Sequence, residues 1–112
     1  MDLEQRLIAL EAIREVCRYK QWGLVAAHVR SNHVHVVVDT GGDVNPEFVM
    51  NALKSYASRA LNLRTPQTRG RIRWARHGST RHLRSRDEID AAVRYVLEKQ
   101  GEPMACHYPS AP

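Results

Sequence analysis

Residues 24–30, LVAAHVR, and residues 33–39, HVHVVVD, are two short apolar runs separated only by the dipeptide Ser-Asn. A two-residue connection between such runs predicts a β-hairpin of antiparallel strands. Alternate residues of a strand share one face, so we expect His33 and His35 to project side by side. The pair is either two surface histidines on a half-exposed strand or two ligands of a divalent cation.

The same hairpin is expected to bring a third imidazole near this pair. With a two-residue turn, His28 pairs with His35 across the two strands and shares its face. His28 is therefore a candidate further metal ligand. The alternative is a strand residue that happens to be histidine.

Apolar residues recur at helical spacing on both sides of the hairpin. Residues 2–21 read as a helix with Asp2 as its N-cap. After a glycine-containing loop, Asn45 as N-cap and Pro46 at the first helical position begin a second helix that runs to about residue 62. These helices supply the apolar stripes that one face of a sheet would bury.

The second half of the chain adds one expected strand and one expected helix. Residues 71–77, RIRWARH, alternate in the manner of a half-buried strand, and Asp87 is expected to cap a helix that runs to about residue 100. Residues 105–112 show no periodicity and are expected to form an irregular tail after a domain spanning residues 1–104. The element order α-β-β-α-β-α indicates an α+β fold.

The length and composition of the chain limit the class of protein. A chain of 112 residues, of which 43% are apolar, is expected to form one domain with a modest core. No apolar run reaches the length of a membrane span, and no charged-then-apolar leader precedes the first helix. The two cysteines lack the paired spacing of a metal or disulfide framework, which favours a reducing, cytoplasmic location.

The charge is unevenly distributed along the chain. The net charge is +5, and no acidic residue occurs between Glu47 and Asp87. Ten of the 17 basic residues lie in that acid-free segment: Lys54, Arg59, Arg64, Arg69, Arg71, Arg73, Arg76, Arg81, Arg84 and Arg86. Nine of them are arginine, whose guanidinium matches phosphate oxygens. This segment predicts a nucleic-acid-binding face, and the alternative is a face for an acidic protein.

Three tyrosines differ in the surroundings that the sequence predicts for them. Tyr56 lies on the apolar stripe of the second helix and is expected in the core, whereas Tyr19 lies near the end of the first helix. Tyr95 falls off the apolar stripe of the last helix, so it is either a surface residue or one presented to something outside that helix. A phenol is a poor nucleophile unless a metal polarises the phosphorus that it attacks.

Four blocks occur in the order found in one family of DNA-processing proteins: AAHVRSNHVHVVV, MNALKSYASRALN, RWARHGSTRHL and AAVRYVLEKQGEP. Together they resemble the REP-associated tyrosine transposase-like family, a branch of the single-tyrosine HUH nucleases. The resemblance implies a ferredoxin-like antiparallel sheet of RNA-recognition-motif type with its helices on one face. It also implies a homodimer, a divalent metal (Mg²⁺ or Mn²⁺) and hairpin-forming single-stranded DNA as substrate.

The resemblance also assigns roles to particular residues. His33 and His35 match the metal-binding HUH pair, and Tyr95 matches the nucleophile that forms a 5′-phosphotyrosyl link during strand cleavage and transfer. The DNA would be bound by the basic residues of the acid-free segment: Lys54, Arg69, Arg71, Arg73, Arg76, Arg81 and Arg84.

The chain departs from the family pattern in two respects. Relatives supply Gln, Asn or His as a third ligand one turn after the tyrosine, but here that position is Lys99. The amide occurs at Gln100 instead, about 140° around the helix from Tyr95. Relatives also begin with a β-strand before the first helix. The sheet is therefore expected to lack that strand, unless a partner chain supplies it.

Three functions follow as hypotheses. The first is a metal-dependent DNA nuclease and strand transferase, which needs the phenol, the imidazoles and the metal together. The second is an inactive descendant that binds hairpin DNA or RNA through its basic face. The third is a small metalloprotein of another kind, supported only by the number of histidines. Formation of a covalent adduct between protein and DNA separates the first from the second.

Overall fold

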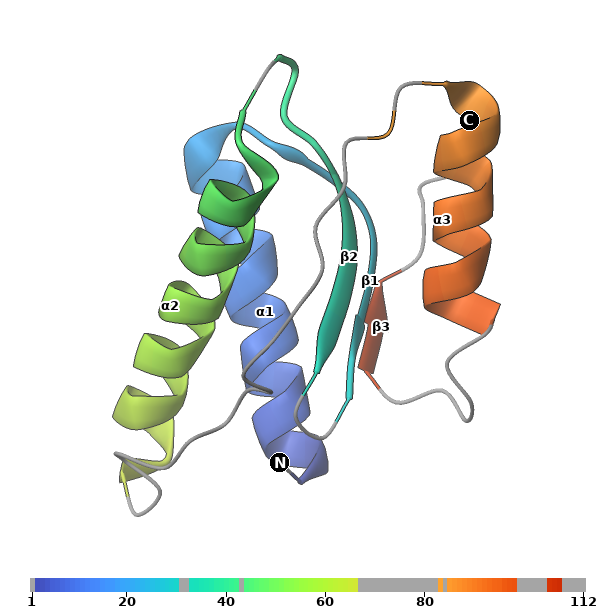
Figure 1. The fold of residues 1–112 in the computed structure, drawn as a ribbon. Coiled ribbons are helices and arrows are strands. Elements are labelled where there is room, and N and C mark those ends of the chain that lie inside the picture. Colours follow the sequence, from blue (N-terminus) through green and yellow to red (C-terminus); the bar gives the residue numbers. More distant parts are fainter. Residues whose placement is uncertain are drawn as a thin grey trace.

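The described part of the chain contains three helices and three strands. The computed structural model describes residues 2–30, 33–42, 44–66, 83, 85–98 and 105–107. Its elements are α1 (Leu3–Lys20), β1 (Gly23–Val29), β2 (Val34–Asp39), α2 (Pro46–Arg64), α3 (Arg86–Glu98) and β3 (Ala105–His107). Three helices and a three-stranded antiparallel sheet make this an α+β structure (Figure 1).

The first two helices begin at the residues that the sequence predicts. At α1 the Asp2 carboxylate accepts a hydrogen bond from the Gln5 amide N–H at 2.8 Å, and the Gln5 side chain accepts one from the Asp2 N–H at 3.1 Å. This reciprocal capping box satisfies two N–H groups that the helix cannot pair internally. At α2 the Asn45 side chain accepts from the Glu47 N–H at 2.9 Å. Both N-caps are confirmed.

The start of α3 differs from the prediction. The Ser85 hydroxyl oxygen accepts a hydrogen bond from the Glu88 N–H at 3.1 Å, so Ser85 is the N-cap. Asp87 lies inside the first turn, where its negative charge still favours the positive end of the helix dipole. The prediction of Asp87 as the cap was wrong, because serine two residues earlier serves equally well.

The hairpin has the predicted register. Strands β1 and β2 pair antiparallel, with Val29 opposite Val34 and His28 opposite His35. The register shifts between Leu24 and Ala26, a bulge that adds one residue to β1. The pairing of His28 with His35 is therefore confirmed.

The third strand comes from the segment that was expected to be irregular. Residues Ala105–His107 pair antiparallel with β1, so the sheet order is β2-β1-β3. A strand of three residues carries almost no alternation in its sequence, and pairing with the edge of β1 stabilises it. The expected strand at residues 71–77 lies outside the described residues. In the part of the chain that the structure describes, the outer edge of β2 pairs with no strand.

The main core lies between one face of the sheet and helices α1 and α2, which run antiparallel to each other (Figure 1). Its largest fully buried side chains include Ile13 of α1 and Leu53 and Leu61 of α2. The sheet contributes Ala27 and Val29 of β1 and the alternate valines of β2. This layer is the one that the helical patterns of α1 and α2 predict.

The other face of the sheet is covered by α3, as the separate position of this helix in Figure 1 shows. Val96 packs there with Ala26 and Val37, and Val93 lies against the same cluster. The expectation of helices on one face only was wrong. Both faces of the hairpin carry apolar residues, and an exposed apolar face is unfavourable in water, so α3 buries the second face.

Candidate functional site

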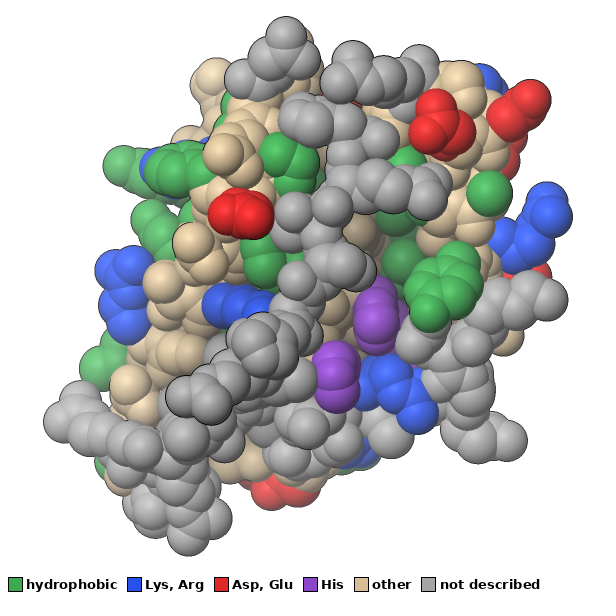
Figure 2. Space-filling model, in the orientation of Figure 1, with side chains coloured by type: hydrophobic (Ala, Val, Ile, Leu, Met, Phe, Trp, Pro, Cys, Tyr) green, Lys and Arg blue, Asp and Glu red, His purple; other side chains and the backbone are tan. Residues whose placement is uncertain are grey.

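His33, which directly precedes β2, and His35, within β2, lie side by side on the α3 face of the sheet. The rings of His33 and His35 are nearly parallel, with an interplanar angle of 6° and centroids 6.2 Å apart. His33 is exposed and His35 is half-buried. Histidine side chains reach the molecular surface beside α3 in Figure 2. The alternation of the strand thus brings both imidazoles to one accessible place.

Tyr95 of α3 lies next to this pair. Its ring is edge-on to the His35 ring, at 81° and with centroids 6.4 Å apart, and the side chain is 55% exposed. The following residue, Val96, is buried in the second core. One turn of α3 therefore holds the helix against the sheet and presents the phenol beside the histidines.

His28 connects the same helix to the middle of the sheet. This side chain is fully buried, and its Nδ1 lies 3.3 Å from the carbonyl oxygen of Val96. A carbonyl oxygen only accepts, so Nδ1 carries the proton and donates it. His28 stands between His35 on β2 and Cys106 on β3. Its hydrogen bond joins α3 to the sheet one residue away from Tyr95.

The local electrostatics favour neutral imidazoles. Burial lowers the pKa of His35, and the nearby charges of His33, His28 and Arg30 lower it further. Burial is also the main cause that lowers the pKa of His28, and the hydrogen bond to Val96 opposes this effect. Neutral imidazole is the form that binds metals. The lowered pKa therefore favours the uncharged imidazole of His35 at neutral pH.

The donor set fits a divalent cation in part. Two imidazole nitrogens on one side suit Mn²⁺ and, less strongly, Mg²⁺, which keeps several waters and shares phosphate oxygens of a substrate. Among the residues that the structure describes, no three His, Cys, Asp or Glu side chains are grouped to hold a metal. His28, a candidate third ligand in the sequence, instead hydrogen-bonds to α3.

Other predicted site residues lie elsewhere or outside the described part. Gln100 falls outside it, as do six of the seven predicted DNA-binding residues: Arg69, Arg71, Arg73, Arg76, Arg81 and Arg84. The seventh, Lys54, is half-buried on α2, in the layer across the sheet from Tyr95. Tyr56 packs against the main core, with the Arg59 guanidinium 4.8 Å from its ring centroid. Its predicted place in the core is confirmed.

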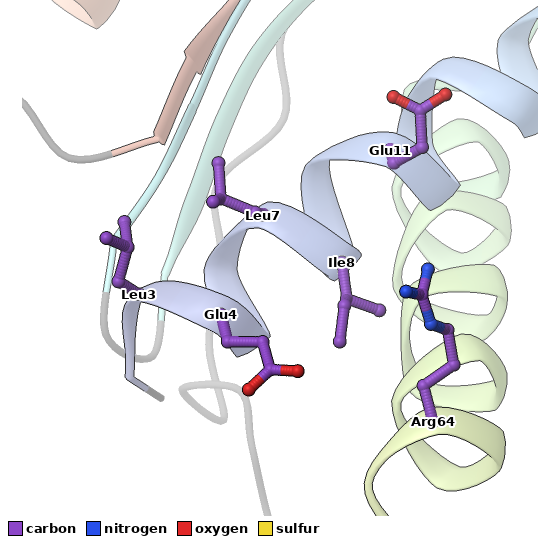
Figure 3. A pocket seen from close by; sticks show the side chains of 6 residues that line it. All are labelled: Leu3, Glu4, Leu7, Ile8, Glu11 and Arg64. Carbon is purple, nitrogen blue, oxygen red and sulfur yellow. The ribbon is translucent and has the colours of Figure 1, made fainter.

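A surface hollow occurs at a different place. It lies between the first turns of α1 and the last turn of α2, as Figure 3 shows. Its lining residues are Leu3, Glu4, Leu7, Ile8, Glu11 and Arg64. None of them belongs to the hairpin or to α3, so the hollow is not part of the histidine site.

Arg30 belongs to the same neighbourhood, although it was not among the predicted site residues. Its backbone N–H donates to the His33 carbonyl oxygen at 2.8 Å, which continues the ladder that pairs Val29 with Val34. Arg30 is therefore opposite His33, as His28 is opposite His35. The register that predicts the His28 pairing also predicts this one.

Comparison with known proteins gives one clear relationship. The family model described as "Transposase IS200 like" matches residues 2–99. No curated protein and no solved structure gives a significant match. In the described residues, no helix is long and apolar enough to cross a membrane. The matched region contains the histidine pair and Tyr95 and spans most of the chain, so the protein belongs to the IS200-like transposase family.

Proposed function

We propose that this protein is a metal-dependent single-stranded DNA endonuclease and strand transferase that acts on hairpin-forming DNA. The observation that carries the proposal is the contact of Tyr95 with His35, beside the parallel ring of His33. A phenol that is accessible to a substrate thus lies beside two imidazole rings that offer nitrogen donors. Proteins of this family are transposases that bind DNA and generally use a divalent metal.

Tyr95 is the proposed nucleophile. Its oxygen forms a bond to the scissile phosphorus, the bond from phosphorus to the 3′-oxygen breaks, and the phenolic proton ends on that 3′-oxygen. The products are a 5′-phosphotyrosyl protein and a free 3′-hydroxyl end. The number of phosphodiester-type bonds is unchanged, so a second 3′-hydroxyl can reverse the step without an external energy source.

His33 and His35 are the proposed ligands of the divalent ion, with Gln100 as a further candidate. A bound Mg²⁺ or Mn²⁺ would supply Lewis-acid polarisation of the phosphate. The two histidines orient the substrate phosphate toward Tyr95. His28 holds α3 in the position that places Tyr95 beside them. The basic acid-free segment binds the DNA strand through its phosphates.

The test is the formation of a covalent adduct. Hairpin-containing single-stranded DNA with a 3′ label on the strand that the tyrosine would retain is incubated with the protein and Mn²⁺ and resolved on a denaturing gel. A slow-migrating labelled protein is expected. Tyr95→Phe should lose the adduct and keep DNA binding, because it removes one hydroxyl and leaves the packing of α3 intact.

Tyr56→Phe is the matched control, since Tyr56 lies against the main core and should be dispensable for chemistry. An adduct that persists in Tyr95→Phe and disappears in Tyr56→Phe would refute the assignment of the nucleophile. If the unaltered protein binds the hairpins but forms no adduct on any of them, the function is that of a hairpin-binding module.

A further inference from the structure

The side chain of Arg30 shares the face of the sheet that carries the histidines and Tyr95. Arg30 directly follows β1 and is two residues beyond His28, so the strand alternation directs both to the α3 side. It pairs with His33 through the backbone hydrogen bond at 2.8 Å. Four side chains thus form a block of two cross-strand pairs, Arg30 with His33 and His28 with His35.

One nitrogen of the Arg30 guanidinium is removed from water and has no compensating partner among the residues that the structure describes. Its Nη1 atom is buried and finds no hydrogen-bond acceptor among the described residues. A desolvated, unpaired charged donor is costly, and native proteins rarely leave one without a reason. The nearest titratable groups that its charge affects are His28 and His35, which are bases and offer it no countercharge.

A cation in this position attracts an anion. The group that enters this site, if the proposed function is correct, is a DNA phosphate. We propose that Arg30 is a catalytic residue that donates to the non-bridging oxygens of the scissile phosphate while Tyr95 attacks the phosphorus. The inference rests on the proposed function and adds to it a residue that neither the histidine motif nor the tyrosine motif contains.

The chemistry suits arginine in particular. Charge on the non-bridging oxygens is redistributed as the bond to Tyr95 forms, and a donor already aligned and desolvated interacts with it more strongly than water does. The planar fork of guanidinium can contact two phosphate oxygens at once, which an ammonium cannot. A phosphate that reaches the guanidinium would bring acceptor oxygens to a group whose Nη1 finds none among the described residues.

The first experiment measures the single-turnover rate of adduct formation and, separately, DNA affinity. Arg30→Gln is expected to slow the rate by roughly 100-fold or more, the usual effect of losing one donor to a developing oxyanion. Arg30→Lys should recover part of that rate, because it restores charge without the fork geometry. The control is Arg18→Gln on α1, which removes the same charge from an exposed helix position and should retain the parental rate.

A second experiment distinguishes catalysis from a structural role and does not need an active enzyme. Arg30→Met keeps the length of the side chain and removes the unpaired donor, so the free energy of unfolding in urea should stay constant or rise. In the unaltered protein, titration with a short single-stranded oligonucleotide should shift the NMR signal of the Arg30 side-chain Nε–H.

The outcomes are separable. If the parent forms no adduct but the Arg30 signal shifts and Arg30→Met is not destabilised, the proposed activity fails and phosphate binding by Arg30 stands. If the parent forms adduct and Arg30→Gln does so at the parental rate, the role of Arg30 is refuted. A marked loss of stability in Arg30→Met, or an Arg30 signal indifferent to the oligonucleotide, would likewise overturn it.

Discussion

His35 of β2 and Tyr95 of α3 meet edge to face within a single chain, with ring centroids 6.4 Å apart. The two residues are 60 positions apart in the sequence, and the packing of α3 on the hairpin brings them together. The family resemblance leads to the expectation of a dimer in which the tyrosine and the histidines of a site come from different subunits. The geometry within one chain supports a site assembled without a partner.

This geometry makes a prediction about mixtures of two inactive variants. His35→Ala keeps the nucleophile and Tyr95→Phe keeps the histidines, so a mixture can assemble a complete site only between different chains. We expect the mixture, incubated long enough for any subunits to exchange, to form no more adduct than the two variants separately. Recovery of adduct in the mixture would show that the site is shared between chains.

The metal prediction concerns His33 and His35. Replacing either one with alanine removes half of the imidazole pair and should weaken Mn²⁺ binding by roughly 100-fold or more. Both replacements should leave the fold intact, because His33 is exposed and His35 only half-buried. Calorimetric titration with Mn²⁺ measures the affinity, with His107→Ala as an imidazole control away from the site. If both variants bind Mn²⁺ with the parental affinity, the assignment of His33 and His35 as metal ligands is wrong.

His28 should act through the position of α3. His28→Leu deletes the hydrogen bond to the Val96 carbonyl, which is worth about 1 kcal/mol of unfolding free energy, and should slow adduct formation while leaving DNA affinity unchanged. In His28→Asn the amide nitrogen can take the place of Nδ1 and should restore most of both quantities. Equal rates in the leucine variant and the parent would show that the contact does not position Tyr95.

The hairpin and the first two helices could be predicted because their signals are local. Strand alternation, a two-residue turn and the caps Asp2 and Asn45 depend on neighbours within a few residues, and the pairing of His28 with His35 follows from them. The side of the sheet on which α3 packs depends instead on apolar residues of the hairpin far away in the sequence, such as Val37.

Two other features had no usable local signal. Strand β3 has three residues and is stabilised by pairing with β1 and by contact with Arg14 of α1, so its sequence alone resembles a tail. The contact between His28 and Val96 joins residues 68 positions apart and exists only once α3 has packed. Arg30 is different, because its place opposite His33 follows from the predicted register and could have been recognised.

DNA binding is expected to depend on the acid-free segment. Replacing Arg71, Arg73 and Arg76 together with glutamine should weaken the affinity for single-stranded DNA and flatten its dependence on salt. Each lost phosphate contact reduces the logarithmic slope by roughly 0.7, so the triple variant should lose about 2 if all three bind phosphate. Fluorescence anisotropy over a salt series measures the slope, with Arg18→Gln/Lys20→Gln on α1 as the control. An unchanged slope would place the DNA elsewhere.

The stability of the protein should depend on pH through the protonation of His107 on β3. The Arg14 Nε–H donates to His107 Nδ1 at 3.1 Å, so that nitrogen is unprotonated in the folded protein. Burial lowers the pKa of His107, the Arg14 charge lowers it further, and a backbone hydrogen bond at Leu24 opposes the shift. Protonation of Nδ1 would break the Arg14 contact and place two cations together.

The unfolded chain therefore binds a proton at this histidine at a higher pH than the folded protein does. Since stability increases with pH wherever the unfolded state holds more protons, the contribution of this histidine to the free energy of unfolding should be constant above about pH 7 and decrease as pH falls through about 6.5 toward the lowered pKa. Urea denaturation at pH 7.5, 6.5 and 5.5 (values chosen as roughly one unit either side of the ordinary histidine pKa) measures this decrease.

His107→Gln is the control, because its side-chain oxygen can still accept a hydrogen bond from Arg14. This variant should show a smaller decrease in unfolding free energy. The remaining decrease is due to His28 and His35, whose pKa values are lowered as well. If the decrease is the same in His107→Gln and the parent, His107 is protonated as easily in the folded protein as in the unfolded chain, and the Arg14 contact does not hold it neutral.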